Sequence, residues 1–220
     1  MNATTLFRES VLCALDGLMK ETGFRRNKRS HAWKQKVSPF QSHGIHLNFG
    51  MNEAAGTVSI IPSVWLRDER IAKLEVESGI VHPEFARERA QFGNVMKSVG
   101  GHDFTCTVAD DSNEISKDIF DEFFAIGIPY LKKLKDANYV LKRLQADKVA
   151  DWPVPSRSDR ARILPLLLIC EGRISEACIT VIDLEIDISG RDQIIPDYRK
   201  FVSWLRSNYC NNVSVTAETS

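Results

Sequence analysis

Hydrophobic and polar residues alternate over two neighbouring segments that follow Gly23. In the first segment, Trp33, Gln35 and Val37 fall on one face of an extended chain. In the second, apolar residues occupy every other position: Ile45, Leu47, Phe49 and Met51. Because successive side chains of a strand point to opposite faces, this two-residue period predicts two strands that pair as a hairpin.

A helix is predicted before this hairpin. Its apolar residues recur at intervals of three and four positions: Phe7, Val11, Leu15 and Leu18. Thr4 or Thr5 is placed to cap the helix, and Gly23 is placed to end it. The apolar stripe predicts that this helix packs on one face of the sheet.

Two further strands complete the predicted sheet. The strand expected over 57–67 contains Pro62, which cannot donate to a β-ladder and therefore indicates an edge position or a bulge. A short strand is expected over 104–108. Between them, the charged runs of 68–101 indicate one or two surface helices without defining the fold of that segment.

Beyond residue 111 the pattern predicts only helices. A helical stripe comprises Ile115, Ile119, Phe120, Phe123 and Phe124. Two later helices are expected to join around Gly172, and an amphipathic helix follows Pro196. The residues Ala150 to Ser156, with two prolines, are the best linker candidate.

These elements predict an α+β fold, with an antiparallel sheet of about four or five strands flanked by helices and followed by an all-helical C-terminal region. The expected boundaries are an α+β domain over 1–135, a helical region over 136–210 packed on it, and a flexible tail over 211–220.

Composition limits the classes of function. The chain of 220 residues has 29 Lys and Arg against 29 Asp and Glu, so its net charge gives no general attraction to nucleic acid or membranes. No secretory signal and no membrane-spanning run is recognisable, which makes the cytoplasm the expected compartment. The five cysteines are widely spaced and lie mostly in apolar runs, so we expect them to be buried, reduced thiols.

No catalytic, metal or cofactor motif is present in the sequence. His43 and His46 would point to opposite faces of a strand and have no Cys-x-x-Cys or His-Glu-x-x-His companion. No nucleophile elbow and no phosphate-binding loop occurs. The carboxylates between Asp110 and Glu122 fit the first turn and the solvent face of a helix. We therefore expect no cofactor and no metal, and an enzyme is the less favoured class.

A basic cluster at the hairpin is the best candidate for binding. It comprises Arg25, Arg26, Lys28, Arg29, His31, Lys34 and Lys36, with Trp33 among them. Such a cluster suits an acidic protein partner, or phosphates with the indole stacked on a base. A charged turn beside an edge strand, where lysine blocks unwanted pairing, would have the same composition.

Four short motifs resemble a bacterial family, the domain of unknown function 4304. They are Gly23-Phe24-Arg25-Arg26, a strand with Trp33, His46-Leu47-Asn48-Phe49-Gly50, and Gly127-Ile128-Pro129-Tyr130-Leu131. The resemblance covers roughly residues 3 to 135 and implies a fold but no catalytic residues. Small bacterial domains of this general kind often occur as immunity proteins, which bind and block a toxin, so the resemblance implies the same expectation here.

The first hypothesis for function is a non-enzymatic protein-binding module, such as an immunity protein, that meets an acidic partner with an open sheet face and the cationic hairpin. The candidate binding residues are Arg25, Arg26, Lys28, Arg29, Trp33, Lys34, His46, Asn48 and Trp65. The alternatives are a nucleic-acid-binding domain that uses residues 25–36, and an enzyme whose site is assembled only in space. No membrane partner is expected.

Overall fold

The computed structural model describes residues 2–27, 31–86, 89–146, 148, 152–188 and 195–211. The chain forms two compact units, each made from two segments. The first unit comprises Met1–Arg67 and Phe92–Lys135, and the second comprises Asp68–Gln91 and Asp136–Ser220. The segment 68–91, which has no clear sequence pattern, therefore belongs with the C-terminal helices.

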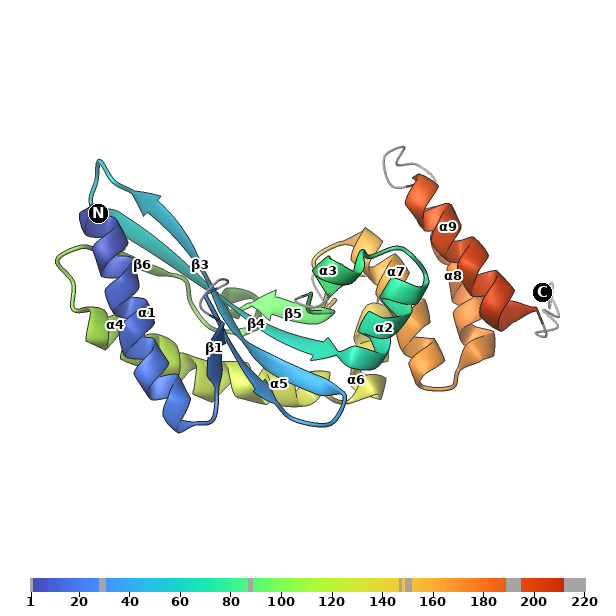
Figure 1. The fold of residues 1–220 in the computed structure, drawn as a ribbon, viewed down its shortest axis with the longest axis horizontal. Helices are drawn as coiled ribbons and strands as arrows, with labels where there is room; N and C mark the ends of the chain where they lie inside the picture. Colours follow the sequence, from blue (N-terminus) through green and yellow to red (C-terminus); the bar gives the residue numbers. More distant parts are fainter. Residues whose placement is uncertain are drawn as a thin grey trace. The chain divides into compact units, whose positions relative to one another are not determined.

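The first unit contains a six-stranded antiparallel sheet (Figure 1). Its strands are β1 (Arg25–Asn27), β2 (Ala32–Lys36), β3 (Gln41–Asn52), β4 (Thr57–Asp68), β5 (Phe92–Val95) and β6 (Phe104–Thr107). The order is β1-β2-β3-β4-β5, and β6 also pairs with β4. The predicted α+β class is confirmed, with six strands in place of four or five because the short strands β1 and β5 lie in segments without clear alternation.

The position of Pro62 differs from the prediction, because β4 is an interior strand. Its first part, Thr57–Ile60, pairs with β6, and Ser63–Leu66 pairs with β5. The two short strands therefore share one edge of β4, and Pro62 falls between their registers. A missing N–H group costs little at a position where the ladder is already interrupted.

Helix α1 (Ala3–Glu21) packs on the inner face of the sheet. Asn2, not Thr4 or Thr5, caps it by accepting a hydrogen bond from the Thr5 N–H. The chain leaves the helix through Gly23, whose φ of 85° suits glycine. The indole Nε1 of Trp33 donates to Asp16 Oδ1 of α1 over 3.0 Å, which ties the helix to β2.

The other helical segments of the first unit follow β5 and β6: η1 (Met96–Val99), α4 (Ser112–Glu122), η2 (Phe123–Gly127) and α5 (Ile128–Leu134). Helix α4 runs beside α1 (Figure 1), and the Ser116 hydroxyl donates to the Val11 carbonyl over 3.0 Å. In η2, Gly127 permits a close approach, because an added Cβ would lie 2.7 Å from Phe123 and 3.0 Å from Val64. These contacts build the core on the same inner face.

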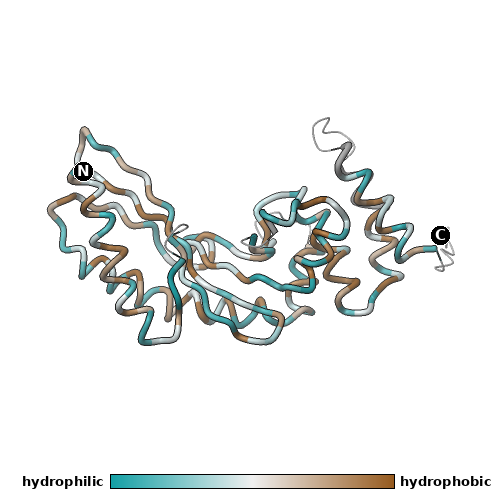
Figure 2. Tube along the Cα trace, viewed as in Figure 1, coloured by the Kyte–Doolittle hydropathy of each residue, from teal (hydrophilic) through white to brown (hydrophobic). Residues whose placement is uncertain are grey.

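The second unit is helical over its described residues. It comprises α2 (Glu69–Glu77), α3 (Pro83–Ala86), α6 (Ala137–Leu144), α7 (Arg157–Cys170), α8 (Ile174–Ile188), α9 (Ile195–Leu205) and η4 (Arg206–Cys210). The hydrophobic run of α7 (Figure 2) is buried among α2, α6 and α8. Trp152 and Val154 are buried too, so the described part of the expected linker is packed. None of the helices described is long and apolar enough to cross a membrane.

The cysteines depart from the expectation of buried, reduced thiols. Cys178 and Cys210 form a disulfide, with a Cα–Cα distance of 5.9 Å. The packing of η4 on α8 brings together two residues separated by 32 positions, which sequence spacing alone does not show. Cys13, Cys106 and Cys170 are free; Cys106 is buried, whereas Cys13 is exposed.

His43 is buried in the core of the first unit, on the face of β3 opposite to that of His46. Its ring stacks on Phe24 with centroids 5.6 Å apart, and its Nε2 lies 3.2 Å from Gln35 Oε1. Burial, with a smaller contribution from the positive charge of Lys135, lowers the pKa of His43 to about 4. The imidazole is therefore neutral at pH 7 and serves packing.

The stability of the protein should depend on pH through His43. Its pKa is lower in the folded chain than the unfolded value of about 6.5, so its contribution is complete above that pH and is lost as pH falls toward 4. Between these limits the native protein should lose at most about 1.4 kcal/mol per pH unit more than a His43→Phe variant. Urea unfolding at pH 7, 6 and 5 measures this difference, and parallel pH profiles for the two proteins would contradict it.

Candidate functional site

The two faces of the sheet in the first unit differ in exposure. On the inner face, Trp33 pairs with Ile45, and both side chains are fully buried. On the outer face, Lys34 pairs with Gly44 in the same two strands. Apart from Gly44 and Arg67, the outward positions of all six strands are exposed or half-exposed. This outer face is the candidate binding surface.

Positive charge gathers on one side of the outer face. Arg25, Lys34 and Lys36, which we call the cationic strip, are exposed on β1 and β2, the hydrophilic edge of the sheet in Figure 2. Arg25 and Lys34 are paired residues, so two like charges lie side by side. The six strands contain one carboxylate, Asp68, whose side chain caps α2 and binds Arg70. The strands thus supply no outward carboxylate to balance the strip.

Apolar side chains lie on the other side of the same face. Ile61 and Val95 are 36% and 37% exposed, and Trp65 is half-exposed. The alternation along β4, with Val95 paired to Ser63, places all three on the outer face. We call them the apolar patch. Because neighbouring strands are about 4.8 Å apart, the β4 residues of the patch lie roughly 10 Å from the part of the strip on β2.

Two glycines lie close against Trp65, one beneath its indole and one beside its backbone. A Cβ added to Gly44 would lie 2.8 Å from Trp65 Cζ2, so the indole lies over that glycine of β3. Gly93, the partner of Trp65 in β5, is equally tight: an added Cβ would lie 3.3 Å from the Trp65 Cβ and 2.4 Å from the Val64 carbonyl oxygen. The indole is therefore held against backbone and keeps one part of its surface toward solvent.

The structure brings five of the predicted binding residues to the outer face: Arg25, Lys34, His46, Asn48 and Trp65. His46 is half-exposed and lies opposite Ala32. The Asn48 amide donates to the Ser63 hydroxyl over 3.5 Å, which links β3 to β4. These polar residues occupy the space between the cationic strip and the apolar patch.

The remaining candidates are placed elsewhere. Trp33 is fully buried, and Arg26 lies on the inner face with its guanidinium 5.6 Å from the Trp33 ring and one nitrogen donating to the Leu12 carbonyl. Trp33 therefore packs in the core and Arg26 packs against it, so neither side chain is on the outer face where a partner would bind. Lys28 and Arg29 lie outside the described residues.

Sequence reasoning missed two members of the surface, Ile61 and Val95. The two-residue period of β4 already places Ile61 on the same face as Trp65, so that signal was available. Val95 follows from the pairing of β5, a strand that the sequence does not indicate.

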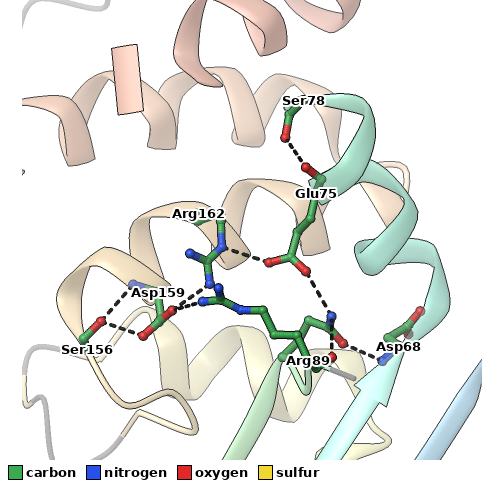
Figure 3. A network of polar contacts seen from close by, with 8 residues as sticks. Asp68, Glu75, Ser78, Arg89, Ser156, Asp159 and Arg162 are labelled. Atoms are coloured by element: carbon green, nitrogen blue, oxygen red, sulfur yellow. Dashed lines mark hydrogen bonds and ion pairs between the residues drawn. The ribbon is translucent and has the colours of Figure 1, made fainter. Parts of the chain in front are cut away.

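The second unit contains a network of charged groups that resembles a catalytic cluster (Figure 3). Glu75, which is fully buried, accepts from Arg162 Nε over 2.9 Å and from the Gln91 amide over 3.0 Å. Asp159 accepts from Arg162 over 2.6 Å and from Arg89 over 2.7 Å. Two carboxylates thus meet two guanidinium groups in a neutral set.

Hydrogen bonding shows that this network is structural. The second oxygen of Asp159 accepts from the Ser156 hydroxyl over 2.6 Å, so both oxygens of both acids are engaged. Burial alone would raise the pKa of Asp159, but the Ser156 hydrogen bond and the charges of Arg162 and Arg89 outweigh it and lower that pKa. Each of these carboxylate oxygens is an acceptor for a side chain of the same unit, which suits a role in holding α2 and α7 together.

A spatially assembled enzyme site could combine a histidine with the carboxylates between Asp110 and Glu122, and His102 does lie beside one of them. His102 Nδ1 lies 2.8 Å from Glu122 Oε2, and the His102 N–H donates to the other oxygen over 2.7 Å. His102 is on an exposed turn. Within the described part of the chain, no three His, Cys, Asp or Glu residues gather as a metal site would require. This pair fixes the turn before β6.

Comparisons with protein-family models, curated proteins and solved structures give no match, so the resemblance to the domain of unknown function 4304 stays a prediction. The functional argument therefore rests on the geometry of the outer face.

Replacing Gly44 by alanine should displace Trp65. The added Cβ would lie 1.9 Å from the Trp33 carbonyl oxygen as well as 2.8 Å from the indole, so we expect a loss of about 1–3 kcal/mol. Gly17→Ala, in α1, is the matched control, because nothing lies within 4 Å of its added Cβ and alanine favours a helix. Urea unfolding measures both; equal stability of the two variants would show that Gly44 does not seat the indole.

Replacing Asp159 by asparagine should destabilise the second unit by about 2 kcal/mol at pH 7, because the buried Arg162 and the partly exposed Arg89 both lose their half-buried counter-charge. The lowered pKa of Asp159 means that its contribution is present above the unfolded pKa of about 3.9 and is lost as pH falls through the folded value. The difference between variant and native protein should therefore narrow below about pH 4.

The exposed pair Arg173–Glu176, which has the same spacing as Asp159–Arg162, provides the control. Glu176→Gln should cost less than about 1 kcal/mol. Unfolding in urea from pH 7 to pH 3 tests both variants, and a cost for Asp159→Asn as small as that of the control would contradict the structural role of the network.

Proposed function

We propose that this protein is a binding module that docks an acidic protein partner on the outer face of its sheet. The observation that supports this most directly is the combination on one open face of the cationic strip, the apolar patch and no strand carboxylate directed outward. Protein interfaces characteristically combine an apolar centre that contains an aromatic anchor with a polar or charged rim.

The components of the face have distinct roles in this proposal. Trp65, held over Gly44, is the anchor that loses its remaining exposed surface to the partner. Ile61 and Val95 extend the apolar contact around it. Arg25, Lys34 and Lys36 attract carboxylates, which speeds association and orients the partner more than it raises affinity.

An acidic protein suits this face better than a nucleic acid does. The nucleic-acid hypothesis relied on Trp33 as a stacking surface, and that side chain is fully buried. Surfaces that bind single strands carry several aromatic rings for successive bases. Among the described outward positions of the strands, Trp65 is the one Trp, Tyr or Phe residue, and its neighbours Ile61 and Val95 are aliphatic. Nucleic acid remains the second candidate because the strip could also bind phosphates.

The partner class can be narrowed further within this proposal. The N-terminal motifs that resemble the domain of unknown function 4304 favour an immunity protein, whose partner would be a toxin with an acidic surface. Mutual repulsion of the strips disfavours a second copy of this chain as the occupant of the face.

The proposal is tested by capturing partners from lysate of the native host, with and without nuclease treatment, on the immobilised native chain and three variants. Trp65→Ala removes the anchor, and the double variant Arg25→Glu/Lys34→Glu reverses the strip. Lys132→Glu/Lys133→Glu reverses two exposed charges of α5, a helix of the first unit and not a strand of the sheet, as the control. We expect an acidic protein that the native chain and the control retain, with retention reduced at least about tenfold by each test variant.

Salt and nuclease distinguish the alternatives. Capture that disappears after nuclease treatment and falls steeply with salt would favour nucleic acid. Equal capture by all variants would show that the outer face is not the binding surface.

A further inference from the structure

The disulfide between Cys178 and Cys210 closes the last helical segment of the second unit onto α8. Cys178 lies in the second turn of α8, and Cys210 ends η4, the turn that continues α9. The bond therefore connects the C-terminal end of the α9–η4 segment to the start of α8. Both cysteines and both helices belong to the second unit, so the feature is independent of the proposed binding face.

Helix α9 packs its apolar stripe chiefly against α8. Phe201, Val202 and Leu205 are almost fully buried, as are Ala177 and Val181 of α8. The disulfide lies at one end of this contact. A covalent bond there limits how far α9 can separate from α8, because it removes chain freedom from the opened state.

The other cysteines do not follow the pattern of a disulfide-stabilised domain, in which the thiols are paired throughout. Three cysteines are free, and Cys13 is exposed. Cys170 is the remaining cysteine of the second unit, and burial raises the pKa of its thiol to about 12, so it is a poor nucleophile for internal exchange. In a compartment that keeps thiols reduced, a single disulfide among free cysteines is usually transient or redox-sensing.

The two bonded cysteine residues also differ in exposure. Cys178 is 4% exposed, whereas Cys210 is half-buried at the end of η4. An external thiolate therefore meets Cys210 first. We therefore expect a reductant to attack the sulfur of Cys210, with Cys178 as the leaving thiolate.

We propose that the Cys178–Cys210 disulfide is a redox-responsive latch that holds α9 and η4 on α8 and is opened by a dithiol reductant. Reduction lets α9 detach and exposes the apolar residues that it buries against α8. Exchange in the reverse direction, with the disulfide form of such a reductant as the oxidant, closes the latch again.

The chemistry balances with a dithiol of the thioredoxin class. Its thiolate attacks Cys210 Sγ, the S–S bond breaks, and Cys178 leaves as a thiolate that takes up a proton. The second thiol of the reductant then attacks the mixed disulfide and releases Cys210. In total two electrons and two protons pass to the protein, and the reductant becomes a disulfide.

The experiment compares the full-length protein with and without a dithiol reductant by hydrogen–deuterium exchange of the backbone amides. Alkylation of the unfolded, unreduced chain should label three cysteines, and the reduced chain five. Amides of α9 should exchange at least about 100-fold faster after reduction, because the disulfide closes a loop of about 30 residues. Amides of β3 in the first unit should be unchanged.

Two variants keep the test decisive. Cys210→Ser should show the fast exchange of α9 without reductant, and Cys13→Ser should behave as the native chain. Equal protection of α9 in the oxidised and reduced forms would overturn the proposal, as would five labelled cysteines before reduction. Loss of protection throughout the second unit, including α7, would also overturn it, because the bond would then support the whole unit and not a separable latch.

Discussion

The hydrogen bond between Trp33 and Asp16 fixes which face of the sheet is buried. A buried indole needs an acceptor for its N–H group, and α1 supplies one from Asp16 at 3.0 Å. Because side chains alternate along a strand, Trp33 inward places Lys34 outward. A shift of one residue would bury a lysine and expose the tryptophan, so the packing of α1 strongly disfavours that register.

The residues on the outer face also follow from the inward position of Trp33. Lys34 is paired with Gly44, the glycine over which Trp65 lies. A side chain at position 44 would therefore collide with two neighbours, the Trp33 carbonyl oxygen of β2 and the Trp65 indole of β4. The position of Trp65, the anchor of the proposed interface, thus depends on Gly44 having no side chain. Gly44 is itself buried and would not contact a partner.

Charge is used in two opposite ways in this chain of zero net charge. In the second unit, Glu75 and Arg162 are buried and Asp159 is half-buried; together with Arg89 they form a set of two acids and two guanidinium groups whose charges cancel (Figure 3). An unpaired charge there would carry a large desolvation cost. On the outer face, Arg25 and Lys34 lie side by side in solvent. Exposed like charges cost little in water at physiological salt, so the face can keep them for a partner.

The sequence predicts the parts of the fold that follow from local period. The alternation of β3 and the stripe of α1 identify both elements and their buried faces. A strand buried on one face is apolar at every second residue, and a helix buried on one face is apolar at every third or fourth residue. The outward position of Trp65 was also accessible in this way. The long central strand was recognised, although Pro62 suggested an edge.

What the sequence does not show depends on pairing between distant segments. Trp33 appears in a cationic cluster, and its burial follows only from the position of α1. The disulfide joins residues 32 positions apart, and the Glu75–Arg162 ion pair joins residues 87 apart, so no local pattern records either contact. The glycine seat of Trp65 likewise requires three strands to be assembled first.

The helical segment 68–91 is inserted between β4 and its short partner strand β5. The segment 68–91 leaves the first unit after β4 and returns at β5, where Leu66 and Phe92 are directly paired. The point of departure and the point of return are thus adjacent, as in a hairpin whose turn has been replaced by a helical insertion. A two-residue turn could close the same sheet, so the first unit can be shortened or fused at this position without altering the pairing of its strands.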